Sequence, residues 1–340
     1  MKELLFRLCT ARGTPGDESG AAEVARQALA AYAQVETDHN GNVIAHMGDP
    51  KAAKHILFDA HIDQIGMIVT WIDDQGFLKA APCGGVDRRV LPGSAVKICG
   101  KEEVTGIVCC TPPHLSQGGE DKVPTFDQLY IDTGLTGEKA RELIAPGDRI
   151  LFTEQPKELL NGRVSVPALD DRSGVAALIR CAELLSKEES LPCRVTFLLS
   201  AQEETGAAGA QTAVFSLYPD EAVMVDVSFA TQPGVPKEKA AQLGKGTMIG
   251  IAPTLCREVT DTLKQLAEEH QVPHQLEVMG GETGTNADVA GVARGGVRCG
   301  LLSIPERYMH TPVEVLELDD IENTAQLLAL YAKKGGIGRD

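Results

Sequence analysis

The chain has 340 residues, of which 43% are hydrophobic and 24% are charged, and its formal net charge is −16. This length and composition are typical of a globular protein that is larger than one simple domain. The acidic balance disfavours nucleic acid and anionic membrane surfaces as partners. No apolar run approaches the ~18 residues of a membrane-spanning helix, so we expect no membrane insertion.

Nine cysteines are scattered along the chain, and only Cys109 and Cys110 are adjacent. There is no C-x-x-C pair, so the sequence indicates neither a thiolate zinc site nor a dithiol redox motif. Charges at Lys2, Glu3 and Arg7 interrupt the first apolar run, which argues against a secretory signal. Reduced thiols without an export signal together predict a cytoplasmic protein.

The first half of the chain contains two kinds of pattern. Apolar residues at helical spacing predict a helix over 17–34, with Asp17 as its N-cap. Two strands follow over 43–47 and 55–62, and the second is apolar enough to be central in a sheet. From 65 to 152, short β-type runs alternate with Gly/Pro turns, which predicts a separate β-rich unit.

After Asn161 and Gly162 the pattern alternates between helices and strands. We predict a helix at 175–185, a strand at 194–200, a strand at 221–227, a helix at 258–269, a strand at 297–304 and a last helix at 319–333. This alternation predicts an α/β fold, with a mostly parallel sheet and helices on both faces. The economical layout is a discontinuous α/β domain over 1–65 and 159–340, interrupted by a β-rich insertion over 66–158.

Five candidate metal ligands stand where an apolar strand-like run has just ended or where a helix is about to begin. They are His61, Asp170, Glu204, Asp226 and His310. Open α/β sheets collect their chemistry at the carboxyl ends of strands, so these residues can meet in one crevice. Two imidazoles and three carboxylates, without a thiolate, suit a pair of divalent cations such as Zn²⁺, Co²⁺ or Mn²⁺. A hydrolase is the class of protein that this set favours.

Two further carboxylates fit roles beside the metal. Asp63 lies two residues after His61 in a strand-like run, so both side chains point to the same face. Asp63 can then accept a hydrogen bond from the ring nitrogen that His61 does not offer to a metal. Glu203 and Glu204 close a hydrophobic strand, and consecutive extended residues diverge. One can therefore bind metal while the other serves as a general base for water.

Each of these motifs also has a simpler interpretation when taken alone. Asp170 and Asp171 can be helix caps favoured by the helix dipole, and His310 can be an ordinary loop histidine. The two glutamates can be a surface charge pair, and most H-x-D sequences are incidental. The joint order H-x-D, D-D-R, E-E, D and H is much more specific than any one of its members.

In this order of motifs the chain resembles the tetrahedral (glutamyl) aminopeptidase family of two-metal exopeptidases. The resemblance runs through nearly the whole length. It is carried by AHIDQIG at 60–66, GGVDRRVLPG at 84–93, TPPH at 111–114, ALDDRSG at 168–174, QEETGAAGA at 202–210, VDVS at 225–228, LGKG at 243–246 and IPERYMHTPVE at 304–314.

The resemblance implies a division of the five ligands between two metal ions. Asp170 bridges both cations, His61 and Asp226 complete one site, and Glu204 and His310 complete the other. The activity that it implies is removal of N-terminal residues from peptides with a free N-terminus, through a water bridged by the two ions.

The same resemblance assigns further roles. Glu203 is the general base, and Asp63 orients His61. The peptide bond after Asp170 is expected to be cis. The β-rich insertion over 66–158 is expected to mediate dimerisation, and dimers are expected to assemble into a homododecamer.

Two residues depart from the pattern of the family. Gln64 replaces the glutamate of H-x-D-E-x-G, and Asn286 replaces the aspartate of G-T-D-A. No proposed ligand is lost, but two negative charges near the site are removed. The pocket for the substrate side chain is expected in loops within 228–255 and 278–290, and the residues there do not reveal a preference. Glu282 is a candidate for this pocket, as is Arg257.

Other functions remain open at this point. A metal-dependent N-acyl amino acid deacylase would use the same constellation. A glycosidase would use paired carboxylates but would need neither His61 nor His310. A non-catalytic peptide-binding or assembly protein is the third alternative, and the intact Glu203 and ligand set argue against it.

Overall fold

A computed structural model describes residues 1–112, 115 and 122–338 of the chain. Its largest element is an eight-stranded sheet with the strand order β1 (Gln34–Thr37), β2 (Val43–Met47), β12 (Arg194–Ser200), β3 (His55–His61), β13 (Glu221–Phe229), β16 (Arg298–Glu306), β14 (Thr247–Ile251) and β15 (His274–Val278). The central strands β12, β3, β13 and β16 are parallel. Antiparallel pairs join β1 to β2, β2 to β12 and β16 to β14. The sheet is therefore mixed, with the predicted parallel arrangement at its centre.

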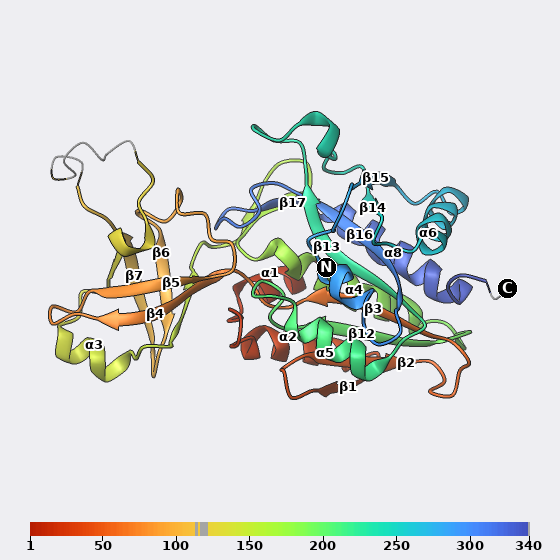
Figure 1. Ribbon diagram of the computed structural model, residues 1–340, viewed down its shortest axis with the longest axis horizontal. Coiled ribbons are helices and arrows are strands. Elements are labelled where there is room, and N and C mark those ends of the chain that lie inside the picture. The colour runs from red at the N-terminus through yellow and green to blue at the C-terminus, as the bar shows by residue number, and fades with distance from the viewer. Residues whose placement is uncertain (113–114, 116–121, 339–340) are drawn as a thin grey trace.

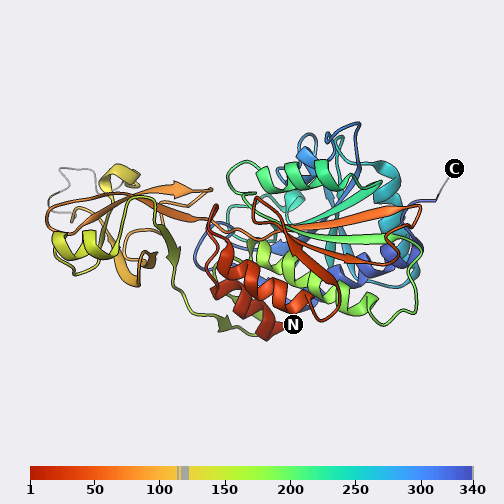
Figure 2. The same ribbon diagram turned by 90° about the horizontal axis from the view of Figure 1, so that it is seen from below.

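Helices cover both faces of this sheet (Figure 2). One face carries α1 (Lys2–Thr10), α2 (Ser19–Leu29), α4 (Leu169–Leu185), α6 (Arg257–Glu269) and α8 (Leu318–Lys334). The other face carries α5 (Ala208–Leu217) and α7 (Asn286–Ala290). Successive strand residues point to opposite faces, so Phe58 packs in the first layer and Leu57 in the second. This confirms the α/β architecture.

The first predicted helix differs from the observed one at both ends. Helix α2 begins at Ser19, and its N-cap is Glu18 rather than Asp17. The Asp17 carboxylate instead accepts a hydrogen bond from Arg12 Nε at 2.5 Å. The helix ends at Leu29, because the chain must turn to start the edge strand β1 five residues later. The apolar spacing beyond Leu29 was therefore wrongly included in the predicted helix.

Helix α5 was not predicted, and its sequence, AGAQTAVFSL, begins with small residues. The reason for the small residues is close packing against the end of β12. A Cβ atom on Gly209 would lie 2.2 Å from the main-chain oxygen of Ala201, so only glycine permits this approach. Glycine and alanine weaken the amphipathic pattern on which a sequence prediction depends.

A second lobe is a closed barrel, seen at the left of Figure 1. Its strands, in spatial order, are β4 (Gly66–Ile72), β5 (Leu78–Cys83), β8 (Tyr130–Asp132), β7 (Glu103–Cys109), β6 (Ala95–Cys99) and β9 (Arg149–Phe152). The lobe also contains α3 (Gly137–Leu143) and the 3₁₀ turn η2 (Phe126–Gln128), and it has its own apolar core. Strand β5 was not predicted, since its sequence LKAAPC contains no β-branched residue. The TPPH motif ends at His114, which lies outside the described residues.

Further short elements lie outside the barrel and the large sheet. A three-stranded sheet has the order β10 (Lys157–Glu158), β11 (Arg163–Ser165) and β17 (Val315–Glu317), and a 3₁₀ turn η3 spans Lys237–Lys239. None of the described helices is both long enough and apolar enough to cross a bilayer. The carboxyl ends of the parallel strands meet along one edge of the large sheet, and this edge carries the site described next.

Candidate metal centre

All five predicted ligands lie at this edge of the large sheet, and each comes from a different element. His61 ends β3, Asp170 lies in the first turn of α4, Glu204 follows β12, Asp226 lies in β13 and His310 follows β16. The strand–helix pattern therefore brings together side chains that are up to 249 positions apart in the sequence (310 − 61 = 249).

Asp170 lies between two histidines and offers each a different oxygen. His61 Nε2 lies 3.0 Å from Asp170 Oδ1 and 3.9 Å from Asp226 Oδ1. His310 Nε2 lies 3.3 Å from Asp170 Oδ2 and 3.5 Å from Glu204 Oε1. The ligand atoms of each triad lie within 4.8 Å of one another. The geometry thus offers two adjacent three-residue sites that share one carboxylate.

The backbone at the start of α4 directs the two neighbouring aspartates differently. The peptide bond between Asp170 and Asp171 is cis, as the family resemblance implied. The Asp171 carboxylate turns away from the shared site and accepts hydrogen bonds from the main-chain N–H groups of His61 and Gly174, each at 3.2 Å. Asp170 therefore faces the two histidines, while Asp171 holds the end of β3 in place.

Asp63 organises the two glutamates that follow β12. Its carboxylate oxygens accept hydrogen bonds from the main-chain N–H groups of Glu203 at 3.0 Å and Glu204 at 3.1 Å. His61 Nδ1 lies 3.2 Å from the main-chain oxygen of Asp63 and 3.5 Å from its carboxylate. The carbonyl is thus the nearer acceptor for the ring, and the carboxylate mainly fixes the turn that carries the glutamates.

Glu314 has a similar role on the other side of the site, and the sequence did not single it out. Its carboxylate accepts hydrogen bonds from the main-chain N–H groups of Asp170 at 3.2 Å and His310 at 3.1 Å. Glu314 is only 1% exposed. The available signal was its position four residues after His310, which lets one side chain reach back to the ligand's own backbone. Groups that orient ligands in this way commonly affect metal affinity.

Burial and mutual repulsion perturb the charged groups of the cluster. Burial raises the pKa of Glu204 to about 8, and the Asp170 charge adds to this effect. Burial alone would lower the pKa of His310, but the Asp170 and Glu204 carboxylates outweigh it and raise the pKa to about 9. Burial also raises the pKa of Asp226. The cluster thus gathers more carboxylates than its two imidazoles can balance.

This excess of acceptors matches what divalent cations require. Glu204 Oε1 is buried and has no hydrogen-bond partner in the described part of the chain. Each triad combines one imidazole nitrogen with carboxylate oxygens, a donor set that suits Zn²⁺, Co²⁺ or Mn²⁺. The residues therefore fit two divalent cations.

A cavity of about 440 Å³ opens in front of the two triads. Its lining includes all five candidate ligands together with Glu203, and the outer wall includes Phe229 and 283–285. Glu203 belongs to neither triad. Burial raises the pKa of its carboxyl group, and the neighbouring His61 opposes that rise. A bound molecule could thus contact the ligands and a separate carboxylate at the same time.

The loop after β5 brings the barrel lobe directly against the ligands. A Cβ atom on Gly85 would lie 2.5 Å from His310 Nδ1, and one on Gly84 would lie 2.9 Å from Glu204 Oε2. Gly84 also has φ +82°, a conformation that other residues rarely adopt. The GGVDRRVLPG motif therefore begins with two residues that must lack side chains.

The two departures from the family pattern lie behind the ligands rather than among them. Gln64 is buried, and its oxygen accepts a hydrogen bond from the buried Arg172 at 3.3 Å. Asn286 Nδ2 donates to Asp59 Oδ2 at 2.8 Å and to Ser200 Oγ at 2.9 Å. Burial raises the pKa of Asp59 to about 7. Both amides therefore belong to polar clusters beneath the site and line neither triad.

The α/β fold and its two histidine–carboxylate triads define a metal-dependent hydrolase. The family described as M42 glutamyl aminopeptidase matches residues 41–327, and the chain belongs to this family. It is a metal-dependent aminopeptidase.

Similar proteins cover almost the whole chain. The lysyl aminopeptidase of Pyrococcus furiosus is 34% identical over 302 residues, which are 86% of this chain and 85% of the relative. The structure of an aminopeptidase from Desulfurococcus kamchatkensis has a TM-score of 0.91 at 31% identity and covers 98% of this chain and 94% of its own. The TET1 peptidase of Pyrococcus horikoshii, which can assemble into a tetrahedron or a large octahedral shell, has a TM-score of 0.87 at 31% identity and covers 97% of this chain and 98% of its own.

Proposed function

We propose that this aminopeptidase uses two divalent cations, one held by His61 and Asp226 and the other by Glu204 and His310, with Asp170 between them. The observation that carries this proposal is that Asp170 faces a different histidine with each of its oxygens, at 3.0 and 3.3 Å. The donor set suits Zn²⁺, Co²⁺ or Mn²⁺.

Glu203 is the residue that handles the proton in this proposal. When bound, the cations would supply Lewis-acid polarisation of the scissile carbonyl and would lower the pKa of water. Glu203 lines the same cavity but belongs to neither triad. Its carboxylate takes a proton from the attacking water and later passes it to the departing amine. Burial raises the pKa of Glu203, which brings it closer to the working pH of such a base.

Asp63 is the positioning residue for this base. It holds the main-chain N–H groups of both Glu203 and Glu204, so it fixes the general base and one metal ligand together. It also lies beside His61 Nδ1, which leaves Nε2 directed at Asp170. This arrangement supports the role of Asp63 in orienting His61.

The test is a panel of aminoacyl-fluorophore substrates, offered to metal-stripped protein and again after Zn²⁺, Co²⁺ or Mn²⁺ is restored. Activity should be absent from the stripped protein and should return with metal. Matched free and N-acetylated peptides separate this function from an N-acyl amino acid deacylase, because an aminopeptidase requires the free amine. Hydrolysis that prefers the acetylated peptide would contradict the proposal.

The proposal extends to domain organisation and assembly. The segments 1–65 and 159–340 form the catalytic part, and the insertion 66–158 mediates dimerisation on the way to a homododecamer. The barrel exposes large apolar side chains, among them Trp71 at 55% and Ile107 at 46%, which supports burial against a second copy. The assembly described for the TET1 peptidase of Pyrococcus horikoshii also supports it. Light scattering on the intact protein measures the subunit number directly.

The remaining elements of the proposal concern location and substrate class. The nine cysteines are all free, which supports a cytoplasmic location. Peptides with a free N-terminus are the substrates. The relative from Pyrococcus furiosus is a lysyl aminopeptidase, so a basic N-terminal residue is one substrate class to test on this chain.

A further inference from the structure

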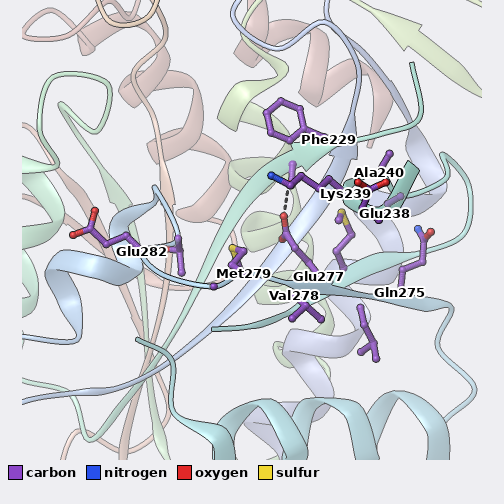
Figure 3. A pocket seen from close by; sticks show the side chains of 15 residues that line it. Phe229, Glu238, Lys239, Ala240, Gln275, Glu277, Val278, Met279 and Glu282 are labelled. Carbon is purple, nitrogen blue, oxygen red and sulfur yellow. Dashed lines mark hydrogen bonds between the residues drawn. The ribbon is translucent and has the colours of Figure 1, made fainter. Parts of the chain in front are cut away.

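A second cavity, of about 400 Å³, lies next to the metal centre (Figure 3). Its lining shares Ser228, Phe229 and Thr283 with the cavity in front of the metal ligands. The rest of its wall comes from β14, β15, the turn after η3 and the segment that follows β15. A substrate whose amine lies at the metal centre therefore has a neighbouring pocket for its first side chain.

The walls of this pocket combine apolar and polar side chains, and one carboxylate is held at a defined position. Phe229, Met248, Val278 and Met279 contribute apolar surface. Glu277 belongs to the same lining, and its side chain points away from that of Val278, the next residue of β15, as Figure 3 shows. This arrangement suits a long apolar stem that ends in a positive charge, which is the character of lysine and arginine side chains.

Glu277 is fixed in place without being neutralised. Ser228 Oγ donates a hydrogen bond to its Oε1, drawn dashed in Figure 3, and Ser303 Oγ donates to its Oε2 at 2.7 Å. Ser303 is 1% exposed and Ser228 is 9% exposed, so both hydroxyl groups are firmly seated. Two neutral donors hold the carboxylate but leave its negative charge available to a ligand.

The other charged residues of the lining are in a weaker position. Glu238, Lys239 and Glu282 are all exposed, whereas Glu277 is partly buried. Solvent and salt screen exposed charges much more than partly buried ones. Glu282 was one of the two residues suggested by the sequence for this pocket, and Arg257 lines neither cavity. The charge that a ligand meets in this pocket is therefore mainly that of Glu277.

The distance from the metal centre also fits. Ser228 lies two residues after Asp226 in β13, so both side chains are on the same face of the strand, about 7 Å apart along it. Ser228 directly contacts Glu277, even though β16 and β14 lie between β13 and β15 in the sheet. The four-carbon stem of lysine, or the arginine side chain, can cover a span of this order.

We infer that Glu277 determines the substrate specificity of the enzyme by pairing with the ammonium or guanidinium group of an N-terminal lysine or arginine. The inference rests on the proposed function, because it assumes that the substrate amine lies at the two triads. Glu277 contacts only the substrate side chain and takes no part in the chemical step.

The experiment compares lysyl, norleucyl and glutamyl fluorogenic substrates on the wild-type enzyme and on Glu277→Gln. Norleucine has the stem of lysine without the ammonium group, so the ratio of the two kcat/KM values isolates the charge. The wild-type enzyme should prefer lysine over norleucine by about 10- to 100-fold, the range expected for a hydrogen bond between charged groups. In Glu277→Gln the ratio should fall to within about threefold of unity, because lysine hydrolysis loses much more than norleucine hydrolysis.

The matched control is a glutamate far from both cavities. Glu102→Gln removes an exposed carboxylate from the barrel lobe and should leave all three substrates unaffected. A wild-type enzyme that favours glutamate over lysine, or an equal loss for every substrate in Glu277→Gln, would overturn the inference. In those cases cleavage of any one substrate still supports the proposed function, whereas failure on all three with metal present would contradict that function itself.

Discussion

The metal centre and the Glu277 pocket adjoin each other, but different kinds of hydrogen-bond donor hold their side chains in place. The proposed ligands lie near the carboxyl ends of buried strands or, for Asp170, at the start of α4, and carboxylates bonded to main-chain N–H groups fix this region. The pocket lies against β15, an edge strand whose side chains are partly exposed. Its carboxylate, Glu277, accepts hydrogen bonds from Ser228 in β13 and Ser303 in β16. The reacting groups are thus held by backbone, whereas the recognition group is held by side chains.

Because of this difference, the substrate selectivity of such an enzyme can change while its reaction is kept. Main-chain donors survive every substitution except one to proline, so the N–H groups that Asp63 and Glu314 hold do not depend on which side chains those positions carry. A side chain on an exposed edge strand can be exchanged without disturbing the buried sheet. We expect substitutions in the centre to affect every substrate alike, and substitutions in the pocket to affect substrates selectively.

The largest expected effect comes from removing the metal. Treatment with a chelator should reduce hydrolysis of every aminoacyl substrate to the background rate, because both triads lose their cations. Metal analysis by mass spectrometry together with a rate assay checks this outcome. Activity retained on any one substrate would contradict the proposed role of the metal centre, since the Glu277 pocket contains no group that could carry out the reaction.

Glu203→Gln should follow in size. The amide cannot take a proton from water, so kcat should fall by about 10²- to 10⁴-fold on all substrates. Metal content should stay at the wild-type level, because Glu203 belongs to neither triad. An unchanged turnover number would remove Glu203 from its proposed role.

Glu314→Gln tests the centre through a residue that touches no substrate. The amide keeps one acceptor oxygen, so it can hold the N–H group of Asp170 or that of His310, but not both. Metal affinity should fall by about 10- to 100-fold, as is typical when a group that orients ligands is lost. Titration of the stripped protein with Zn²⁺ measures this change, and the lysine-to-norleucine ratio should stay constant.

The pH dependence of metal binding should be steep. His310 has a pKa raised to about 9 in the metal-free protein, so at pH 7 its ring carries a proton that a cation must displace. Glu204, whose pKa is raised to about 8, must lose a proton as well, so apparent metal affinity should rise by at least about tenfold per pH unit up to about pH 9 and then level off. Calorimetry in buffers of different ionisation enthalpy measures the released proton. A flat profile between pH 6 and 8 would contradict the raised pKa.

Ser303→Ala should have the smallest effect and the most selective one. It removes one of the two hydrogen bonds that hold Glu277, and a bond of this kind contributes about 1 kcal/mol. The lysine-to-norleucine ratio should fall by about three- to tenfold, while norleucine hydrolysis stays within twofold of the wild-type value. Equal losses on both substrates would place Ser303 in the structure of the centre instead.

The residues of the two triads could be selected from the sequence because they interrupt or follow apolar runs, and the structure brings them together. His61 ends β3, Asp226 lies near the carboxyl end of β13 and His310 follows β16, and the apolar runs that precede these residues can be recognised without coordinates. The parallel centre of the sheet then requires these ends to meet. The cis peptide bond after Asp170 came from the family resemblance rather than from any pattern in the residues.

The pocket and the anchoring carboxylates could not be predicted in the same way. Glu277 lies one residue outside the range in which the pocket was expected, in the short edge strand β15, which was not predicted. Its significance depends on Ser228 and Ser303, which approach it only when the sheet is assembled. Glu314 resembles any other glutamate in a loop until the fold places it under His310. Contacts between distant segments determine both roles.

At Gly84 and Gly85 the main chain of the barrel lobe covers part of the metal centre. The main chain that leaves β5 passes over His310 and Glu204 with no room for even a methyl group. On this side, His310 and Glu204 are therefore covered by main-chain atoms without side chains. Substitutions can change the strands of the lobe, but at these two positions any added carbon would collide with His310 or Glu204, the proposed metal ligands.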